Sequence, residues 1–235
     1  MVNDMKIGII FAMEEELDAL KKHLIIEKEF ELFDLKFYEA CANNIKCVLV
    51  MCGIGKVNSA RTTQILIDNI KVDYIFNIGV AGGIDNSLKV GDIVVGTSLV
   101  QHDFDITAFN HEKGYIPNVG KNIYCDEYLL RIIKSMDLSL VFGVIASGDI
   151  FCTDDKMAQK IHDKFSALCV EMEGASIAQV CYLCNIPFLI IRSISDTPNN
   201  DNAVTFDEFL KMSSDKVADI MIKLIKKLSN VEDEL

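Results

Sequence analysis

Residues 46–79 read KCVLVMCGIGKVNSARTTQILIDNIKVDYIFNIG, and their pattern is the clearest guide to the architecture. An apolar run of strand length comes first, a turn containing two glycines leads into a helical segment, and a second apolar run follows. Strands that alternate with helical segments are typical of a sheet covered by helices. The stretch therefore predicts an α/β fold.

The same alternation extends in both directions along the chain. Expected strands cover residues 6–11, 36–42, 46–51, 74–79, 92–101, 141–147, 167–173 and 187–195, and expected helices cover 14–23, 56–69, 126–136, 155–163, 174–184 and 206–228. Asn43 and Asn44 favour a hairpin turn because Asn tolerates positive φ, so the sheet should be mixed. The length fits one domain over residues 1–235.

The charge balance excludes several classes of partner. The chain has 23 Lys and Arg against 35 Asp and Glu, a formal net charge of -12. Such a surface repels phosphate backbones and anionic headgroups, so we expect no nucleic-acid and no membrane partner. The longest apolar runs have strand length, well below the roughly 20 residues of a membrane helix. Residues 1–6 lead straight into an expected strand and show no export signal.

The eight cysteines and four histidines form no metal-binding pattern. Half of the cysteines lie in apolar strand-like runs, where thiols act as small hydrophobes, and the expected location is the reducing cytoplasm. Cys181 and Cys184 have redox or metal spacing, but they fall late in an expected helix and no second such pair follows. We therefore expect no metal.

Candidate functional residues follow the expected strands. Ligands of open α/β sheets bind outside the carboxyl ends of the strands. Four segments at such ends carry residues suited to binding or catalysis: Met13-Glu14-Glu15-Glu16, Asn77-Ile78-Gly79-Val80-Ala81-Gly82-Gly83, Val170-Glu171-Met172-Glu173-Gly174, and Leu189-Ile190-Ile191-Arg192-Ser193-Ile194-Ser195-Asp196.

Each of these segments also has a purely structural interpretation. Acidic residues at 14–16 suit the first turn of a helix through its dipole, and the glycines suit a tight turn. Glu171 and Glu173 should share one face of a strand, where two buried carboxylates need a use or a partner, unless the strand ends there. Arg192 inside an apolar run suits an ion pair with one of these glutamates, and Asp196 suits the cap of a turn.

Taken together and in order, the segments resemble the 5'-methylthioadenosine/S-adenosylhomocysteine nucleosidases of the nucleoside phosphorylase superfamily. The resemblance implies a three-layer α/β/α fold in one domain. The matching pieces, which span nearly the whole chain, are Ile7-Gly8-Ile9-Ile10, Ala12-Met13-Glu14-Glu15-Glu16, Gly53-Ile54-Gly55-Lys56-Val57, Ala81-Gly82-Gly83, Leu88 to Val95, Asp105-Ile106-Thr107-Ala108-Phe109, Ser147-Gly148-Asp149, Val170-Glu171-Met172-Glu173, Ser195-Asp196, and Phe206-Asp207-Glu208-Phe209.

The resemblance implies an activity and roles for three residues. The activity is hydrolysis of the N-glycosidic bond of 5'-methylthioadenosine and S-adenosylhomocysteine, which releases adenine and the 5-thio-substituted ribose without a cofactor. Glu16 is similar to the base that activates water, and Asp196 to the acid that protonates adenine N7. Arg192 resembles the arginine that helps to position the water.

The resemblance also implies a set of substrate contacts and a homodimer. Glu173 matches the residue that binds the ribose hydroxyls, Met172 the one beneath the sugar, Phe151 the aromatic stacked on adenine, and Cys152 a backbone contact to the purine. In the 5' pocket it implies Ile54, Ile106, Phe109 and Phe206, with Pro117 and His111 reaching in from the partner subunit. The remaining expected contacts are Met13, Val80, Ala81, Gly82, Glu171 and Ser195.

One departure and three alternatives stay open. The family commonly has Ser where this chain has Val80. The alternatives are a purine nucleoside phosphorylase of the same fold, a nucleosidase for another adenine nucleoside such as aminodeoxyfutalosine, and a sensor that binds adenine nucleosides without catalysis. Residues 103–122 lack periodicity, and long irregular segments in compact domains are often functional.

Overall fold

The computed structural model describes residues 5–197 and 202–232, without the side chains of residues 202–208 and 231–232. Its strands are β1 (Lys6–Phe11), β2 (Ile26–Leu32), β3 (Leu35–Ala42), β4 (Ile45–Met51), β5 (Tyr74–Gly83), β6 (Ile93–Gln101), β7 (Ile123–Tyr124), β8 (Val141–Ser147), β9 (Ala167–Glu171) and β10 (Phe188–Asp196). Its helices are α1 (Glu14–Lys21), α2 (Lys56–Ile65), the π-helical η1 (Leu66–Ile70), the 3-10 turn η2 (Thr107–Phe109), α3 (Glu127–Lys134), α4 (Asp155–Phe165), α5 (Gly174–Cys184) and α6 (Asn202–Glu232).

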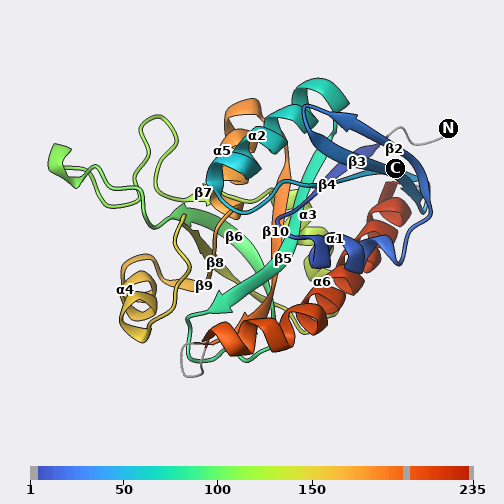
Figure 1. Cartoon of the computed structure of the whole chain (residues 1–235). Coiled ribbons are helices and arrows are strands. Elements are labelled where there is room, and N and C mark those ends of the chain that lie inside the picture. Colours follow the sequence, from blue (N-terminus) through green and yellow to red (C-terminus); the bar gives the residue numbers. More distant parts are fainter. Residues whose placement is uncertain (1–4, 198–201, 233–235) are drawn as a thin grey trace.

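The central sheet is mixed and lies between helices, which confirms the expected α/β/α architecture. The strands follow the order β10-β6-β8-β9-β5-β1-β4-β3-β2, and β10 also pairs with β5. This extra pairing closes β5, β10, β6, β8 and β9 into a ring, while the remaining strands of that order form an open wing. Figure 1 shows α2 and α5 on one side of the sheet and α1 and α6 on the other.

The β2 strand was not among the expected elements, and its sequence explains why. IEKEFEL alternates charged and apolar residues, and the strand pairs only with β3 at the edge of the sheet. Charged side chains on an edge strand limit pairing with other chains, and they also hide the strand from a search for apolar runs. The predicted Asn43-Asn44 turn is confirmed, since both residues have positive φ (49° and 64°).

Two expected strand boundaries near the carboxyl edge were wrong. β5 continues to Gly83 instead of ending at 79, because the small residues after Gly79 still pair with β10 and β9. β9 ends at Glu171, and Glu173 has φ -132° and ψ -44° as the residue that precedes α5. Glu171 and Glu173 therefore do not share a strand face. The expected helix 56–69 changes from α to π geometry after Ile65.

The core consists of apolar side chains on both faces of the sheet. Buried residues include all of β1 after Lys6 and every residue of β10, and α6 packs against β10. Cys47 and Cys169 are buried as expected, and burial raises the pKa of Cys47 to about 12, whereas Cys41 is exposed on β3. Within the described ranges, no helix is long and apolar enough to cross a membrane.

Candidate active site

A cavity of about 250 Å³ opens at the carboxyl ends of β1, β5, β9 and β10. Its walls are mostly apolar, but four carboxyl groups reach into it. The lining residues are Ala12, Met13, Glu16, Ile54, Val80, Ala81, Gly82, Ile150, Phe151, Cys152, Val170, Glu171, Met172, Glu173 and Asp196. A mostly apolar pocket with a few convergent polar groups is typical of a small-molecule site.

Glu16 is fixed in the cavity by backbone amides. One carboxylate oxygen accepts hydrogen bonds from the N–H groups of Ala12 (2.9 Å) and Met13 (3.1 Å), and the other accepts one from Val80 (2.9 Å). Glu14 and Glu15 are exposed, whereas Glu16 is buried. A favourable interaction with the helix dipole therefore explains the presence of Glu14 and Glu15 only. Burial raises the pKa of Glu16, and the charge of Arg192 and the three amides oppose that rise.

The glycine that precedes Val80 is required by this arrangement. A Cβ atom at Gly79 would overlap the Glu16 carboxylate. Because glycine has no side chain, the end of β5 can approach Glu16 closely enough for the Val80 N–H to donate a hydrogen bond to it. The Val80 side chain itself is nearly buried and lines the cavity.

Asp196 lies opposite, at the end of β10. The pairing of β10 with β5 shifts register between Ile194 and Asp196, which turns the carboxyl group over Gly82. The Ser195 hydroxyl donates to one Asp196 oxygen at 2.8 Å, and Asp196 is 3% exposed. Burial raises the pKa of Asp196, and the bond from Ser195 lowers it by less. The structure therefore favours the protonated form of this acid more than water does.

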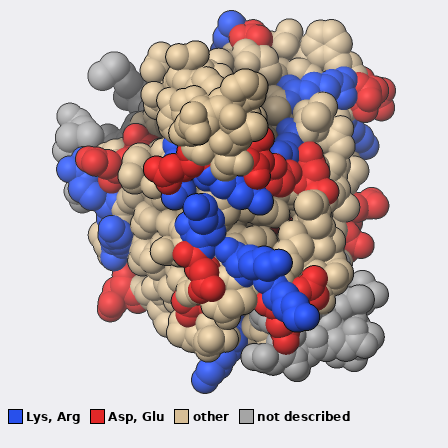
Figure 2. Space-filling view, turned by 90° about the vertical axis from the view of Figure 1, so that its left-hand side faces the viewer, with Lys and Arg blue, Asp and Glu red and all other residues tan. Residues whose placement is uncertain are grey.

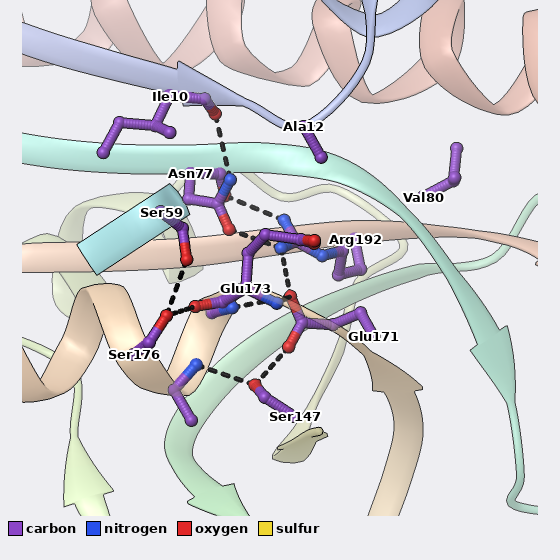
Figure 3. Close-up of polar contacts among 12 residues, drawn as sticks. Ile10, Ala12, Ser59, Asn77, Val80, Ser147, Glu171, Glu173, Ser176 and Arg192 are labelled. Carbon is purple, nitrogen blue, oxygen red and sulfur yellow. Dashed lines mark hydrogen bonds and ion pairs between the residues drawn. The ribbon is translucent and has the colours of Figure 1, made fainter. Parts of the chain in front are cut away.

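Arg192 forms an ion pair with Glu171, and Figure 3 shows its guanidinium group between Glu171 and Asn77. Arg192 is 2% exposed and also donates to the carbonyl oxygens of Asn77 (3.3 Å) and Ile191 (3.2 Å). The sequence suggested an ion pair between Arg192 and one of the two glutamates, and the structure shows that this partner is Glu171. Glu171 also accepts hydrogen bonds from the Ser147 hydroxyl and from the Gly174 N–H (2.7 Å).

Glu173 has a different environment from Glu171. It is 5% exposed, and one oxygen accepts a hydrogen bond from the N–H of Gly55 at 2.8 Å. Burial and the nearby charge of Glu171 raise the pKa of Glu173. Glu16, Glu171 and Glu173 therefore surround the single buried guanidinium group of Arg192. The acidic side chains at the cavity outnumber the basic ones.

Most of the expected site residues meet in this cavity, but six of those that the structure describes do not line it, namely Arg192, Ser195, Ile106, Phe109, His111 and Pro117. Arg192 and Ser195 are fully covered and act through Glu171 and Asp196, respectively. Ile106 is half-buried, and Phe109 and Pro117 are exposed, because the segment after β6 projects away from the sheet (Figure 1). The side chain of Phe206 lies outside the described residues.

The sequence analysis placed Asn77 and Ser147 within its segments but assigned no role to either, and both are neutral members of the buried network. Asn77 donates to the Ile10 carbonyl at 2.9 Å and accepts from Arg192, and the Ser147 hydroxyl accepts from the Ala175 N–H at 2.7 Å. Asn77 stands in an apolar run like Arg192, so the same argument about buried polar groups would have found it. Ala12, Ile150 and Val170 also line the cavity. Ala12 and Val170 belong to segments singled out in the sequence, but none of the three was an expected contact.

The chain is similar to known proteins over nearly its full length. The model of the phosphorylase superfamily matches residues 6–226. A 5'-methylthioadenosine/S-adenosylhomocysteine nucleosidase of Exiguobacterium is 40% identical over 95% of this chain and 99% of its own length. The crystal structure of the Helicobacter pylori nucleosidase of the same name, complexed with a substituted pyrrolidinol, has a TM-score of 0.92 at 35% identity and covers 98% of this chain and 99% of its own. A structure described as a futalosine hydrolase of Helicobacter pylori has a TM-score of 0.91 at 34% identity and covers 98% of both chains.

Removal of the Arg192 guanidinium should destabilise the fold. Arg192→Met leaves Glu171 buried without its cation, which should lower the free energy of unfolding by about 3–5 kcal/mol. The double variant Arg192→Met/Glu171→Gln should recover part of this loss, because the uncompensated charge is gone. Urea denaturation at constant pH measures both values.

The matched control is Arg61→Met, because the Arg61–Asp34 ion pair is exposed on both sides. Exposed pairs are screened by water, so this variant should unfold at nearly the wild-type urea concentration. Equal midpoints for Arg192→Met and Arg61→Met would contradict the central role of the buried pair.

Proposed function

This chain belongs to the phosphorylase superfamily and is a nucleosidase that hydrolyses N-glycosidic bonds, and we propose that its substrates are 5'-methylthioadenosine and S-adenosylhomocysteine. The products would be adenine and the 5-thio-substituted ribose. One observation carries the proposal: a buried glutamate held by three amides and a buried aspartic acid with a raised pKa reach into the same apolar cavity. The relatives with these substrates in their names cover nearly the whole chain.

Asp196 and Glu16 divide the proton transfers. Asp196 gives its proton to adenine N7, which makes the purine a better leaving group as the bond between N9 and the anomeric carbon breaks. Glu16 takes a proton from water while the water oxygen forms its bond to that carbon. The ribose gains positive character in between, and the buried carboxylate of Glu16 stabilises it. Glu173 binds the ribose hydroxyls, and Phe151 and Met172 pack on the purine and the sugar.

Arg192 acts from behind the cavity wall in this scheme. Its ion pair fixes Glu171, and its charge opposes the rise in the pKa of Glu16, which keeps more of that base ionised. Its Nε is buried and has no acceptor among the described residues.

Water suits this site better than phosphate does. A phosphorylase must hold a dianion beside the ribose and needs cationic donors there. Here the proposed base, Glu16, is a carboxylate in the cavity, and a carboxylate about 4 Å from a phosphate oxygen would repel it by roughly 4 kcal/mol per unit charge at an effective dielectric of about 20. Arg192 is already paired with Glu171, and Lys56 with Asp103.

We also propose that the active form is a homodimer. Ile106, Phe109 and Pro117 lie outside the cavity of their own chain, and Phe109 is 76% exposed. Figure 2 shows an uncharged protrusion above a band of charged side chains on the face from which this segment projects. Apolar side chains so far from their own core are suited to cover the pocket of a second copy and to exclude water from it.

The nature of the nucleophile can be tested by product analysis. Incubation with 5'-methylthioadenosine in phosphate-free buffer should release adenine and a free reducing sugar at the same rate as in phosphate. A ribose 1-phosphate product, or a rate proportional to phosphate, would favour the phosphorylase. A panel that includes S-adenosylhomocysteine and aminodeoxyfutalosine, compared by kcat/KM, tests the substrate assignment, and a wild-type protein that releases no adenine would favour the sensor.

Glu16→Gln should remove the base and retain the substrate site. We expect kcat to fall by at least about a hundredfold, the usual contribution of general-base catalysis, with little change in KM. Glu15→Gln is the matched control, because Glu15 is exposed on the same turn and should keep wild-type kinetics. A near-normal kcat for folded Glu16→Gln would exclude Glu16 as the base.

Asp196→Asn should remove the proton donor and change the pH profile. The protonated fraction of Asp196 falls as pH rises through its raised pKa, so kcat/KM of the wild type should decline on the alkaline side. The variant should lose at least about a hundredfold in rate and should lack this alkaline limb. If the limb persisted in Asp196→Asn, another group would have to be the acid.

The assembly can be tested by sedimentation velocity at the concentrations used in the assay. We expect one species with the mass of two chains, and Phe109→Ser should shift the population towards monomer, because the exposed ring would lie in the interface. A fully active wild-type monomer would contradict the proposed cover of the pocket.

A further inference from the structure

Lys56, the first residue of α2, is a cation near the cavity with no role in the proposed chemistry. Its Nζ lies 2.7 Å from one carboxylate oxygen of Asp103 and donates to the side-chain oxygen of Gln101 at 3.2 Å. The side chains of Lys56 and Asp103 are each only 18% exposed. The pair is thus largely enclosed, unlike an ordinary surface ion pair.

A third residue closes the pair into a ring of hydrogen bonds. The second oxygen of Asp103 accepts from the N–H of Asp149 at 3.0 Å, and the Asp149 carboxylate accepts from the N–H of Lys56 at 2.8 Å. The three residues come from three different segments: the start of α2, the segment after β6 and the segment after β8. Each of these contacts therefore ties together parts of the chain that are distant in sequence.

Two of the three segments continue directly into the cavity wall. Ile54 and Gly55 precede Lys56; Ile54 lines the cavity, and the N–H of Gly55 binds Glu173. On the other side, Asp149 is followed by three lining residues, Ile150, Phe151 and Cys152. The hydrogen bonds described above for Glu16 and Asp196 involve other segments, namely residues 12–13, 80 and 195.

We propose that Lys56, Asp103 and Asp149 form a positioning unit that sets substrate affinity. The ring holds the Gly55 N–H on Glu173, which binds the ribose, and holds Phe151 at the adenine. It does not touch the two groups that transfer protons. The identity of the ligand rests on the proposed function, whereas the geometry of the ring does not.

The charge state of the ring is consistent with this role. Burial raises the pKa of Asp103, but the hydrogen bond from Lys56 and the bond from the Asp149 N–H outweigh it, and the net shift is downward. Asp103 therefore stays ionised at neutral pH. One oxygen of Asp103 accepts from Lys56 and the other from the Asp149 N–H, so the carboxylate fixes the orientation of both residues.

Kinetic variants test the ring. Lys56→Met and Asp103→Asn should each raise KM for 5'-methylthioadenosine about tenfold and leave kcat within about twofold, because they weaken binding of the ground state and the transition state alike. The double variant should be no worse than the poorer single variant, since both changes break the same unit. Lys56→Arg, which keeps a cation of similar reach, should recover most of the affinity.

The matched control is Glu112→Gln, the same change from acid to amide in the same projecting segment. Glu112 forms an ion pair with Lys121 at 3.0 Å but is 70% exposed and takes no part in the ring. It should keep the wild-type KM. A lower kcat at unchanged KM in Lys56→Met, or additive losses in the double variant, would overturn the proposal.

Hydrogen exchange gives a readout that does not depend on the substrate. Peptides spanning residues 53–60 and 148–152 should exchange faster in Lys56→Met and Asp103→Asn than in the wild type, while peptides of β1 and β10 should not change. This result would stand even if the wild type failed to release adenine, which would refute only the proposed function. Unchanged protection in both segments would overturn the positioning unit.

Discussion

The site depends on one buried guanidinium group among three buried carboxylates. Arg192 neutralises Glu171 directly and favours the ionised form of Glu16, and Glu173 is left with a raised pKa. Buried charges need partners and hydrogen bonds, and the chain meets this need with Asn77, Ser147 and backbone amides (Figure 3). The ionised carboxylate of Glu16 suits a ligand that becomes positive during the reaction, and it opposes a phosphate nucleophile.

The glycines at the strand ends make this concentration of acids possible. Gly79 and Gly82 lie where a Cβ would overlap Glu16 or stand 3.1 Å from an oxygen of Asp196. Both glycines belong to β5, which pairs with β1, β9 and β10 at once. The closed ring of strands and the site therefore both depend on β5. Its last residues are small, so the neighbouring segments can place carboxyl groups close to it.

The sequence predicted the architecture because the strands and helices are long and strongly patterned, and it predicted most of the cavity lining because the candidate residues follow strands. It did not predict β2, an edge strand whose apolar residues are interrupted by charged ones, or the end of β9, since the turn that separates Glu171 from Glu173 depends on the amides of Glu173 and Gly174. The choice of Glu171 as the partner of Arg192 is likewise a matter of three-dimensional distance. The local sequence offers both glutamates equally.

The effect of Val80, a departure from the family pattern, depends on which of its atoms contact the site. The family commonly has Ser at this position, and a lost hydroxyl would matter if it bound the water or the sugar. In this chain the contact to Glu16 comes from the backbone N–H of Val80, which any residue except Pro supplies. The isopropyl group adds apolar surface to the cavity beside the carboxylate, and less polar surroundings disfavour its charged form. The substitution therefore preserves the position of Glu16 and acts, if at all, on its pKa.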